Sequence, residues 1–288
     1  MRSRQARTAY LLIAPVFLLF LAFTVYPLLW SAQISLTSWD GLNAVKKFVG
    51  LQNYSHLLRD PEFLQSFRVT VIYSVSVTLI STVLGFGLAF LLQRRHRSAA
   101  FYRTVFFSPV VTATVAAAVV WQLIFDPFAG PINVGLRAIG IAGPGWLGDP
   151  HWALVAVSIV GIWKRIGFAM VIFSAGLSSL PTSCFEAAAL DGATGWRLMR
   201  YITIPLLRPI TALVLITGLI DSVQVFDHIF IMTNGGPLGS TNVLSLYLYN
   251  QGFKIFHLGY ASAVGWVLFG IVLAATIMQW QFKKGTEK

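Results

Sequence analysis

Long apolar runs recur along the whole chain, and they constrain its fold more than any other feature of the sequence. A helix needs about 20 mainly apolar residues to cross a bilayer core about 30 Å thick. Six stretches meet this requirement, at 9–30, 70–93, 104–125, 152–177, 207–230 and 258–282. The fourth is the weakest, because Lys164 and Arg165 interrupt it. The sequence therefore predicts an all-α polytopic membrane protein whose six transmembrane helices form a single domain over residues 1–288.

The composition supports a membrane protein over a soluble one. Of the 288 residues 56% are hydrophobic and only 11% are charged, whereas about 25% charged residues are usual in soluble domains. The net charge of +11 would suggest nucleic acid in a soluble protein. Here Lys and Arg stand in short clusters between the apolar runs, so we expect a lipid bilayer and no nucleic acid as partner. Cys184 is the only cysteine, which excludes a disulfide within the chain, and we expect no metal or cofactor.

The distribution of Lys and Arg predicts the orientation of the chain, because cytoplasmic loops carry an excess of these residues. With both termini inside, the cytoplasmic cations are Arg2, Arg4, Arg7, Arg94, Arg95, Arg97, Arg103, Arg197, Arg200, Arg208, Lys283, Lys284 and Lys288. The longer external loops then hold fewer cations, namely Lys46, Lys47, Arg59, Arg68, Arg137 and Lys254. We therefore expect an N-in, C-in topology.

The loop at 181–206, between the fourth and fifth spans, has the pattern of a helix-turn-helix that lies outside the bilayer. Ser183 and Glu186 match the S-x-x-E capping box that starts a helix. A turn, a second cap and a helix end are then predicted at Asp191-Gly192, Thr194 and Pro205. The orientation above places this motif on the cytoplasmic side.

The same loop resembles a known family. The spacing of Glu186-Ala187-Ala188, Gly192, Ile202, Ile204 and Pro205 is similar to the EAA loop of binding-protein-dependent ABC permeases, with Ile204 where that pattern favours Leu. The resemblance implies a coupling loop that docks on a separate ATPase subunit and transmits its closure to the pore. The coupling residues it implies are Glu186, Ala187, Ala188, Asp191, Gly192, Ala193, Ile202 and Pro205. Glu186 could also serve only to cap the helix with Ser183, and the two roles are compatible.

Further segments, in order along nearly the whole chain, resemble the first permease of the maltose, lactose and glycerol-phosphate group. They include Leu11-Leu12-Ile13-Ala14-Pro15, Tyr26-Pro27, residues 48–54, Asn133, Phe226-Asp227, residues 233–237 and residues 259–263. The resemblance implies a second permease subunit in a heterodimer, two cytoplasmic ATPase subunits, an external solute-binding protein and a place in the bacterial cytoplasmic (inner) membrane. It also implies that an external turn at Asn234, Gly235, Gly236 and Pro237 contacts the binding protein.

Polar residues inside the predicted spans indicate a solute pathway, because such residues face protein or water rather than lipid. Thr217, Asp221, Gln224 and His228 recur at i, i+4, i+7 and i+11, which would place them on one helical face. This stripe lines the solute route or pairs with another helix or subunit. Three arrangements are open for Lys164 and Arg165: they face the same cavity, they pair with Asp221, or they mark a break in the fourth span. This cationic pair would suit a phosphorylated or acidic solute.

The chain has no GxxxxGK[ST] phosphate loop and no HExxH, CxxC or GxSxG motif. We therefore expect no enzyme activity, and ATP hydrolysis would belong to a partner. The resemblance implies import of a sugar or related polar solute by alternating access. Two alternatives remain at this stage. An ion-coupled secondary transporter would use Asp221 or Asp227, and a scaffold or receptor subunit would need no polar stripe.

Overall fold

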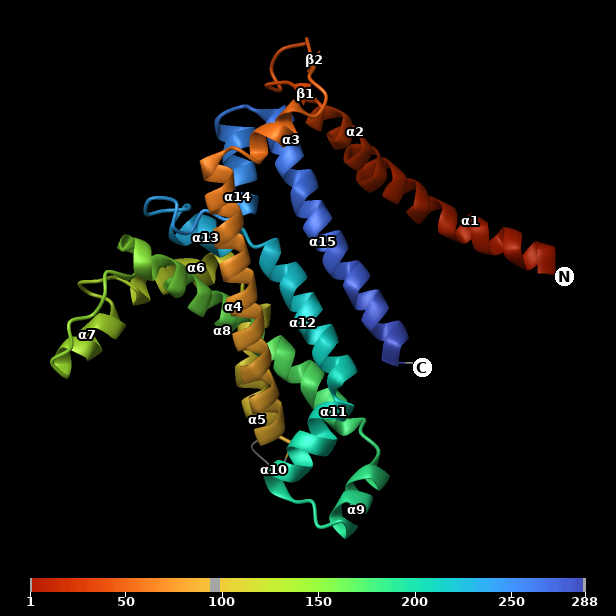
Figure 1. Cartoon of the computed structure of the whole chain (residues 1–288), viewed down its shortest axis with the longest axis vertical. Helices are drawn as coiled ribbons and strands as arrows, with labels where there is room; N and C mark the ends of the chain where they lie inside the picture. The colour runs from red at the N-terminus through yellow and green to blue at the C-terminus, as the bar shows by residue number, and fades with distance from the viewer. Residues whose placement is uncertain (1, 94–98, 287–288) are drawn as a thin grey trace. The chain divides into compact units, whose positions relative to one another are not determined.

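The computed structural model describes residues 2–93 and 99–286, and most of them are helical (Figure 1). The predicted cations Arg94, Arg95, Arg97 and Lys288 lie outside the described residues, and the topology that rests on them stays a prediction. By contact, the chain divides into two compact units, Met1–Pro61 with Tyr247–Val267 and Glu62–Leu246 with Leu268–Lys288. The two units are described separately below.

The first unit begins with a continuous helical rod that is made of α1 (Arg2–Phe20), the π-helical segment η1 (Leu21–Val25) and α2 (Tyr26–Ser35). Most of its apolar side chains from Tyr10 to Trp30 are exposed, as expected for a span that faces lipid or another subunit. A two-residue antiparallel ladder follows, β1 (Thr37–Ser38) with β2 (Lys47–Phe48), and then α3 (Gln52–Leu57). The end of α14 (Leu244–Tyr249), the π-helical η4 (Asn250–Lys254) and the first part of α15 (Leu258–Thr286) complete this unit.

The second unit contains the remaining helices. They are α4 (Pro61–Leu91), α5 (Ala99–Val111), α6 (Thr114–Ile124), α7 (Pro131–Ala138), the 3₁₀ segment η2 (Trp146–Gly148), α8 (Pro150–Ser178), α9 (Thr182–Leu190), α10 (Gly195–Leu198), the π-helical η3 (Met199–Thr203), α11 (Ile204–Leu206), α12 (Arg208–Val223) and α13 (Asp227–Met232). One buried apolar cluster of the unit joins α4, α8 and α12, and its members are Ala89, Ala169, Met170, Phe173, Leu177, Leu207 and Val214. This cluster fixes the positions of these three helices relative to one another.

Glycines let α8 lie unusually close to its neighbours. A Cβ at Gly167 would meet the backbone of Phe106 and Phe107 on α5, and a Cβ at Gly85 on α4 would meet Ala169 and the backbone of Met170. Small residues at helix contacts allow such close backbone approach in membranes, where packing replaces the hydrophobic driving force. Helix α8 is therefore held tightly between α4 and α5.

Four helices are long and apolar enough to cross a membrane: Tyr10–Ser35, Pro61–Leu91, Pro150–Ser178 and Leu258–Met278. Two bent pairs, α5 with α6 and α10–α11 with α12, raise the number of candidate spans to six. This range confirms the polytopic all-α fold class that the apolar runs predict. The fourth predicted span, the weakest by sequence, is an unbroken helix, α8. Lys164 and Arg165 do not interrupt it, because both side chains have hydrogen-bond partners within the second unit.

The third predicted span, 104–125, is bent. The chain bends by 100° between α5 and α6, where Ala113 leaves the helical region at φ −56° and ψ 121°. Pro109 lies inside α5 and cannot donate a backbone hydrogen bond, and the Ser108 hydroxyl donates instead to the carbonyl of Val105 at 2.9 Å. Proline thus weakens the helix one turn before the bend.

The fifth predicted span, 207–230, begins at a bend and is interrupted after Val223. The chain bends by 66° at Leu207, just before Pro209 in the first turn of α12. Helix α12 then ends at Val223, and α13 begins only at Asp227. The carbonyl of Val225, which the second break releases, accepts a hydrogen bond from the Ser245 hydroxyl.

Candidate translocation cavity and coupling loop

A cavity of about 410 Å³ lies in the second unit, and most of the polar residues that the sequence singled out within the spans line it. Its lining residues are Tyr73, Val77, Val110, Thr114, Gly161, Lys164, Arg165, Phe168, Asp221, Ser222, Gln224, Val225, Phe226, Asp227 and His228. They come from α4, from both sides of the bend between α5 and α6, from α8, and from the break after α12. Thr217 is absent from this lining, although it lies near Arg165.

The prediction that Thr217, Asp221, Gln224 and His228 lie on one face of a single helix was wrong. Only Thr217 and Asp221 lie on α12, Gln224 is the residue that ends that helix, and His228 belongs to α13. The break nevertheless leaves Asp221, Gln224 and His228 around the same cavity. The predicted grouping is therefore present in space, although its cause is a broken helix.

Arg165 pairs with Asp221, which is one of the arrangements that the sequence analysis left open. An Arg165 Nη donates to Asp221 Oδ2 at 2.6 Å, and the other Nη donates to the carbonyl of Val214 at 3.0 Å. Gly218 makes room for the guanidinium, since a Cβ there would lie 2.7 Å from an Arg165 nitrogen. The Arg165 side chain is 8% exposed and that of Asp221 65% exposed, so the pair neutralises a buried cation at the cavity wall.

Lys164, the next residue on α8, has a different partner. Its Nζ donates to the carbonyl of Thr112 at 2.7 Å. Thr112 lies in the bend that ends α5, where helix carbonyls lack their usual backbone donors. A cation at a helix C-terminus also interacts favourably with the helix dipole. Lys164 thus joins α8 to the bent third span at the edge of the cavity.

Tyr73 and His228 both line the cavity, and their side chains contact each other. His228 Nε2 lies 2.9 Å from the Tyr73 hydroxyl, and both side chains are buried. Gly161 on α8 faces this tyrosine, since a Cβ at that position would lie 3.2 Å from Tyr73 Cζ. Tyr73 was missed in the sequence analysis because one tyrosine among many aromatic residues carries no pattern.

The loop at 181–206 forms the predicted helix-turn-helix, with differences at its boundaries. Helix α9 starts at Thr182 after Pro181, and no side-chain hydrogen bond caps it among the described residues, so the Ser183–Glu186 capping box was wrong. Gly192 makes the predicted turn at φ +71°, and Thr194 precedes α10, also without a side-chain cap in this part of the chain. Pro205 does not end the second helix, because helical backbone continues to Leu206.

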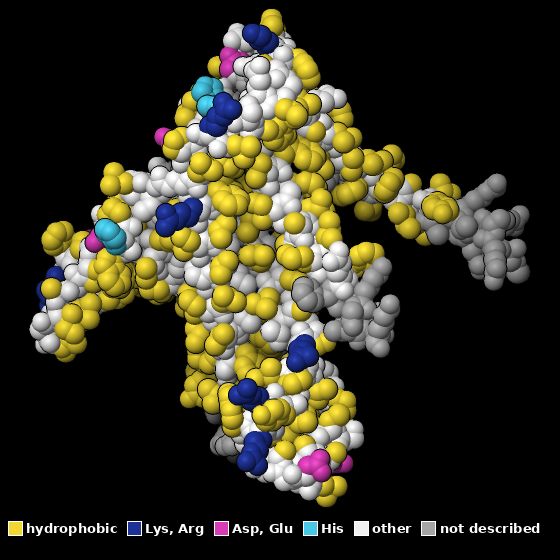
Figure 2. Space-filling model, viewed as in Figure 1, with side chains coloured by type: hydrophobic (Ala, Val, Ile, Leu, Met, Phe, Trp, Pro, Cys, Tyr) yellow, Lys and Arg dark blue, Asp and Glu magenta, His cyan; other side chains and the backbone are white. Residues whose placement is uncertain are grey.

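The predicted coupling residues differ in their exposure. Glu186, Ala187, Asp191 and Gly192 are exposed, Ala193, Ile202 and Pro205 are half-buried, and Ala188 is buried. Two large apolar side chains that were not singled out lie beside them, Leu190 at 91% and Trp196 at 65% exposure. Figure 2 shows apolar and charged side chains mixed on the lower end of this view, where α9 and α10 lie in Figure 1. Exposed large apolar side chains in a polar setting are typical of a protein interface.

The tight turn predicted at 233–237 is present. Asn234 and Gly235 have φ of +47° and +86°, and the Gly236 N–H donates to the carbonyl of Thr233 at 2.9 Å. Thr241 Oγ1 donates to the carbonyl of Gly236 at 2.8 Å and fixes the turn. The neighbouring Leu238 is 86% exposed, which the sequence analysis did not predict.

The comparisons with known proteins agree with this arrangement. A family model described as "Binding-protein-dependent transport system inner membrane component" matches residues 81–287. The chain is 34% identical to the trehalose/maltose transport system permease protein MalF of Thermococcus litoralis over 278 residues, 96% of this chain and 94% of that protein. It is 36% identical to the sn-glycerol-3-phosphate transport system permease protein UgpA of Agrobacterium fabrum over 274 residues, 95% and 93% of the two chains.

A solved structure shares the fold. A chain from the crystal structure of a bacterial alginate ABC transporter, in complex with an alginate pentasaccharide-bound periplasmic protein, aligns with a TM-score of 0.83. The alignment covers 96% of this chain and 93% of that chain at 22% sequence identity. These findings leave the ion-coupled secondary transporter without support. The chain belongs to the family of binding-protein-dependent transport system inner membrane components, the permease subunits of ABC importers.

Proposed function

We propose that this permease forms part of the path by which a sugar or related polar solute is imported by alternating access, with energy from separate ATPase subunits. The observation that carries the proposal is the 410 Å³ cavity, whose wall combines Asp221, Gln224, His228 and Lys164 with apolar side chains. Carboxylate, amide and imidazole groups can hydrogen-bond hydroxyls, and an apolar frame with a few polar groups is usual for a small-molecule site.

The charges around the cavity favour a neutral solute over an acidic one. Arg165 is already paired with Asp221, and Lys164 donates to the carbonyl of Thr112. Asp227 adds a further carboxylate to the same wall. Because the cationic pair at 164–165 is thus compensated, its presence does not argue for a phosphorylated solute. The relatives include transport systems for trehalose/maltose and lactose, which are neutral sugars, and one for sn-glycerol-3-phosphate, so the preference for a neutral solute rests on the cavity charges and not on these names.

The proposed assembly contains a second permease subunit, two ATPase subunits and a solute-binding protein. Both termini and the loop at 181–206 would lie in the cytoplasm of a bacterial cell, with the chain in its cytoplasmic (inner) membrane. Leu190 and Trp196 support a docking role for the loop, since their apolar side chains are exposed outside the buried core. The turn at 233–237 and the loop segments of the first unit at 36–60 and 250–257 would lie on the outer side, where the binding protein delivers solute.

Reconstitution tests the proposal. The permease is assembled in proteoliposomes with the second permease, the ATPase and the binding protein encoded beside it, and uptake of labelled maltose, trehalose and lactose is measured. We expect uptake of at least one of these sugars that requires ATP and the binding protein. Uptake that continues without ATP but follows a proton or sodium gradient would overturn the proposal.

A further inference from the structure

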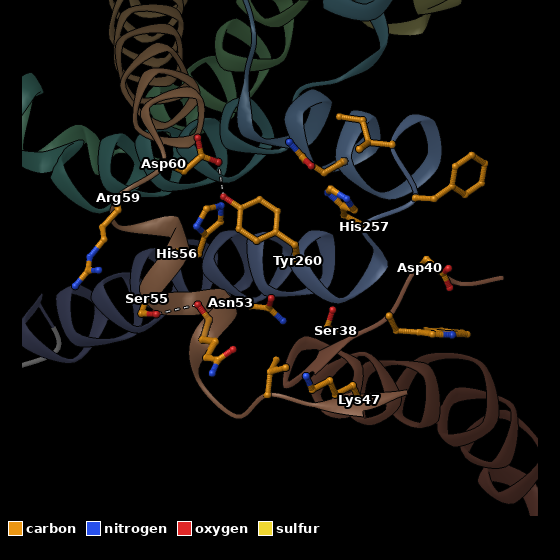
Figure 3. Close-up of a pocket in the computed structure, with 16 residues that line it drawn as sticks. Ser38, Asp40, Lys47, Asn53, Ser55, His56, Arg59, Asp60, His257 and Tyr260 are labelled. Carbon is orange, nitrogen blue, oxygen red and sulfur yellow. Dashed lines mark hydrogen bonds between the residues drawn. The ribbon is translucent and has the colours of Figure 1, made fainter. Parts of the chain in front are cut away.

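A second cavity, of about 840 Å³, lies within the first unit, and the proposed solute path does not use it (Figure 3). Two segments that are far apart in the sequence form its wall, residues 38–60 and residues 251–260. In Figure 3 the side chains of His56 and His257 lie on either side of the Tyr260 ring. The proposed orientation places this cavity on the outer face.

Internal hydrogen bonds hold the two wall segments together. The Asp60 carboxylate accepts a hydrogen bond from the Tyr260 hydroxyl at 2.5 Å and another from the Tyr247 hydroxyl. The Gly259 N–H donates to the carbonyl of Trp39 at 3.0 Å. Asn53 Nδ2 donates to the carbonyls of Ser35 and Thr37 at 2.7 and 3.0 Å. The cavity is therefore preformed.

Both carboxylates of the wall are engaged by hydrogen bonds from within the first unit. Asp40 accepts from the N–H groups of Leu42 and Asn43, which lower the pKa of this carboxyl below its usual value, and also from the Asn43 side chain. Asp60 is engaged by the two tyrosines. Within the described residues, Lys47 and Arg59 have neither a hydrogen-bond nor an ion-pair partner for their side chains. The wall therefore suits an acceptor-rich, anionic group.

The surroundings of the cavity favour a protein as the source of that group. Both wall segments expose large apolar side chains beside the cations, among them Leu42, Val45, Phe48 and Ile255. Lys47 and Arg59 are exposed themselves, and exposed cations bind a free anion only weakly in water. A partner that covers the rim removes water from such charges, and they then contribute to the rate and specificity of association.

We propose that this cavity receives acidic side chains of the external solute-binding protein, with Lys47 and Arg59 as cationic partners at separate parts of its wall. The proposal rests on the proposed function, because that function supplies the binding protein. The binding protein would then contact this chain at two places, the cavity and the uncharged turn at 233–237. Residues 37–60 hold three cations, Lys46, Lys47 and Arg59, and two carboxylates, Asp40 and Asp60, so this wall segment has the net positive charge that an acidic partner requires.

The test measures how tightly the purified binding protein docks on the complete transporter in nanodiscs of zwitterionic lipid. We expect Lys47→Gln and Arg59→Gln each to weaken docking by about 2- to 5-fold, and the double variant by more. The variants should also flatten the dependence of affinity on salt. Arg59→Lys keeps the charge and should dock like the wild type. Lys254→Gln is the matched control, because this cation lies over the Tyr249 ring and not in the cavity wall.

Other results would overturn the proposal. Unchanged docking of the double variant would do so, and so would a loss that appears only when anionic lipid is added, since that would assign the cations to a lipid headgroup. Wild-type uptake, measured on the same preparation, separates the two claims. If ATP-driven uptake is present and the double variant docks normally, the docking site is refuted while the proposed function stands.

Discussion

Arg165 on α8 and Asp221 on α12 form an ion pair of 2.6 Å at the wall of the 410 Å³ cavity. The guanidinium is buried and also donates to the carbonyl of Val214, whereas most of the carboxylate surface is exposed. The pair therefore joins α8 and α12 at an exposed point of the cavity wall. Its carboxylate neutralises the buried cation and remains available to the cavity.

Asp221→Asn should destabilise the protein, because it leaves the buried Arg165 without its anionic partner. Breaking a fully buried pair costs about 3–5 kcal/mol, and the exposure of Asp221 reduces the expected loss to about 1–3 kcal/mol. The double variant Arg165→Met/Asp221→Asn should recover most of this stability but not sugar uptake. Thermal unfolding in detergent and uptake in proteoliposomes measure the two effects. Additive losses of stability in the double variant would show that the two residues are not coupled.

Lys164→Met should impair transport while the protein still inserts and assembles. The Thr112 carbonyl in the bend between α5 and α6 would lose its donor, and with it the contact that joins α8 to this bend. Lys164→Arg retains a donor and should keep much of the activity. ATP-dependent uptake, normalised to the amount of assembled complex, distinguishes the variants. Equal uptake by Lys164→Met and the wild type would remove Lys164 from the transport machinery.

Gly192→Ala should weaken association with the ATPase subunits. Gly192 has φ +71°, a conformation that costs a residue with a Cβ about 1–2 kcal/mol, and nothing lies close enough to clash with the added methyl. Gly87→Ala on α4 is the matched control, because space is open there too and the backbone is helical. Co-purification of the ATPase reports the difference. The prediction is wrong if both variants retain the ATPase equally.

Leu190→Asp and Trp196→Ala should reduce ATPase binding further, by about 10- to 100-fold, if these exposed side chains are central to the interface. Leu238→Asp changes a comparably exposed leucine near the turn at 233–237 and should leave ATPase binding unchanged. Affinity can be measured with the purified ATPase and nanodisc-embedded permease. An equal effect of all three changes would point to general instability and not to an interface.

The apolar runs predicted the polytopic all-α fold class, because lipid requires long apolar segments whatever the packing around them. The breaks at 112–113, at Leu207 and at 224–226 were not predictable in the same way. The carbonyls of Thr112 and Val225 find their donors in Lys164 and Ser245, which are distant in sequence. The pairing of Arg165 with Asp221 was one of the three arrangements that the sequence left open, since a cation in a span needs an anion.

The coupling loop shows the limit of local patterns. The turn at Gly192 follows from residue type, but the Ser183–Glu186 capping box failed because the helix starts after Pro181. The cavity in the first unit was missed because its wall combines residues 38–60 with residues 251–260. Lys47 and Arg59 had been counted only as external charges, and nothing in the sequence placed them on one surface.

The most direct measurement of the central claim is ATP-driven sugar uptake by proteoliposomes that contain the complete transporter, with residues 183–205 of this chain either native or scrambled. The account predicts uptake with the native segment. With the scrambled segment it predicts a permease that still inserts but neither retains the ATPase nor imports sugar. Undiminished ATP-driven uptake with the scrambled segment would contradict the account.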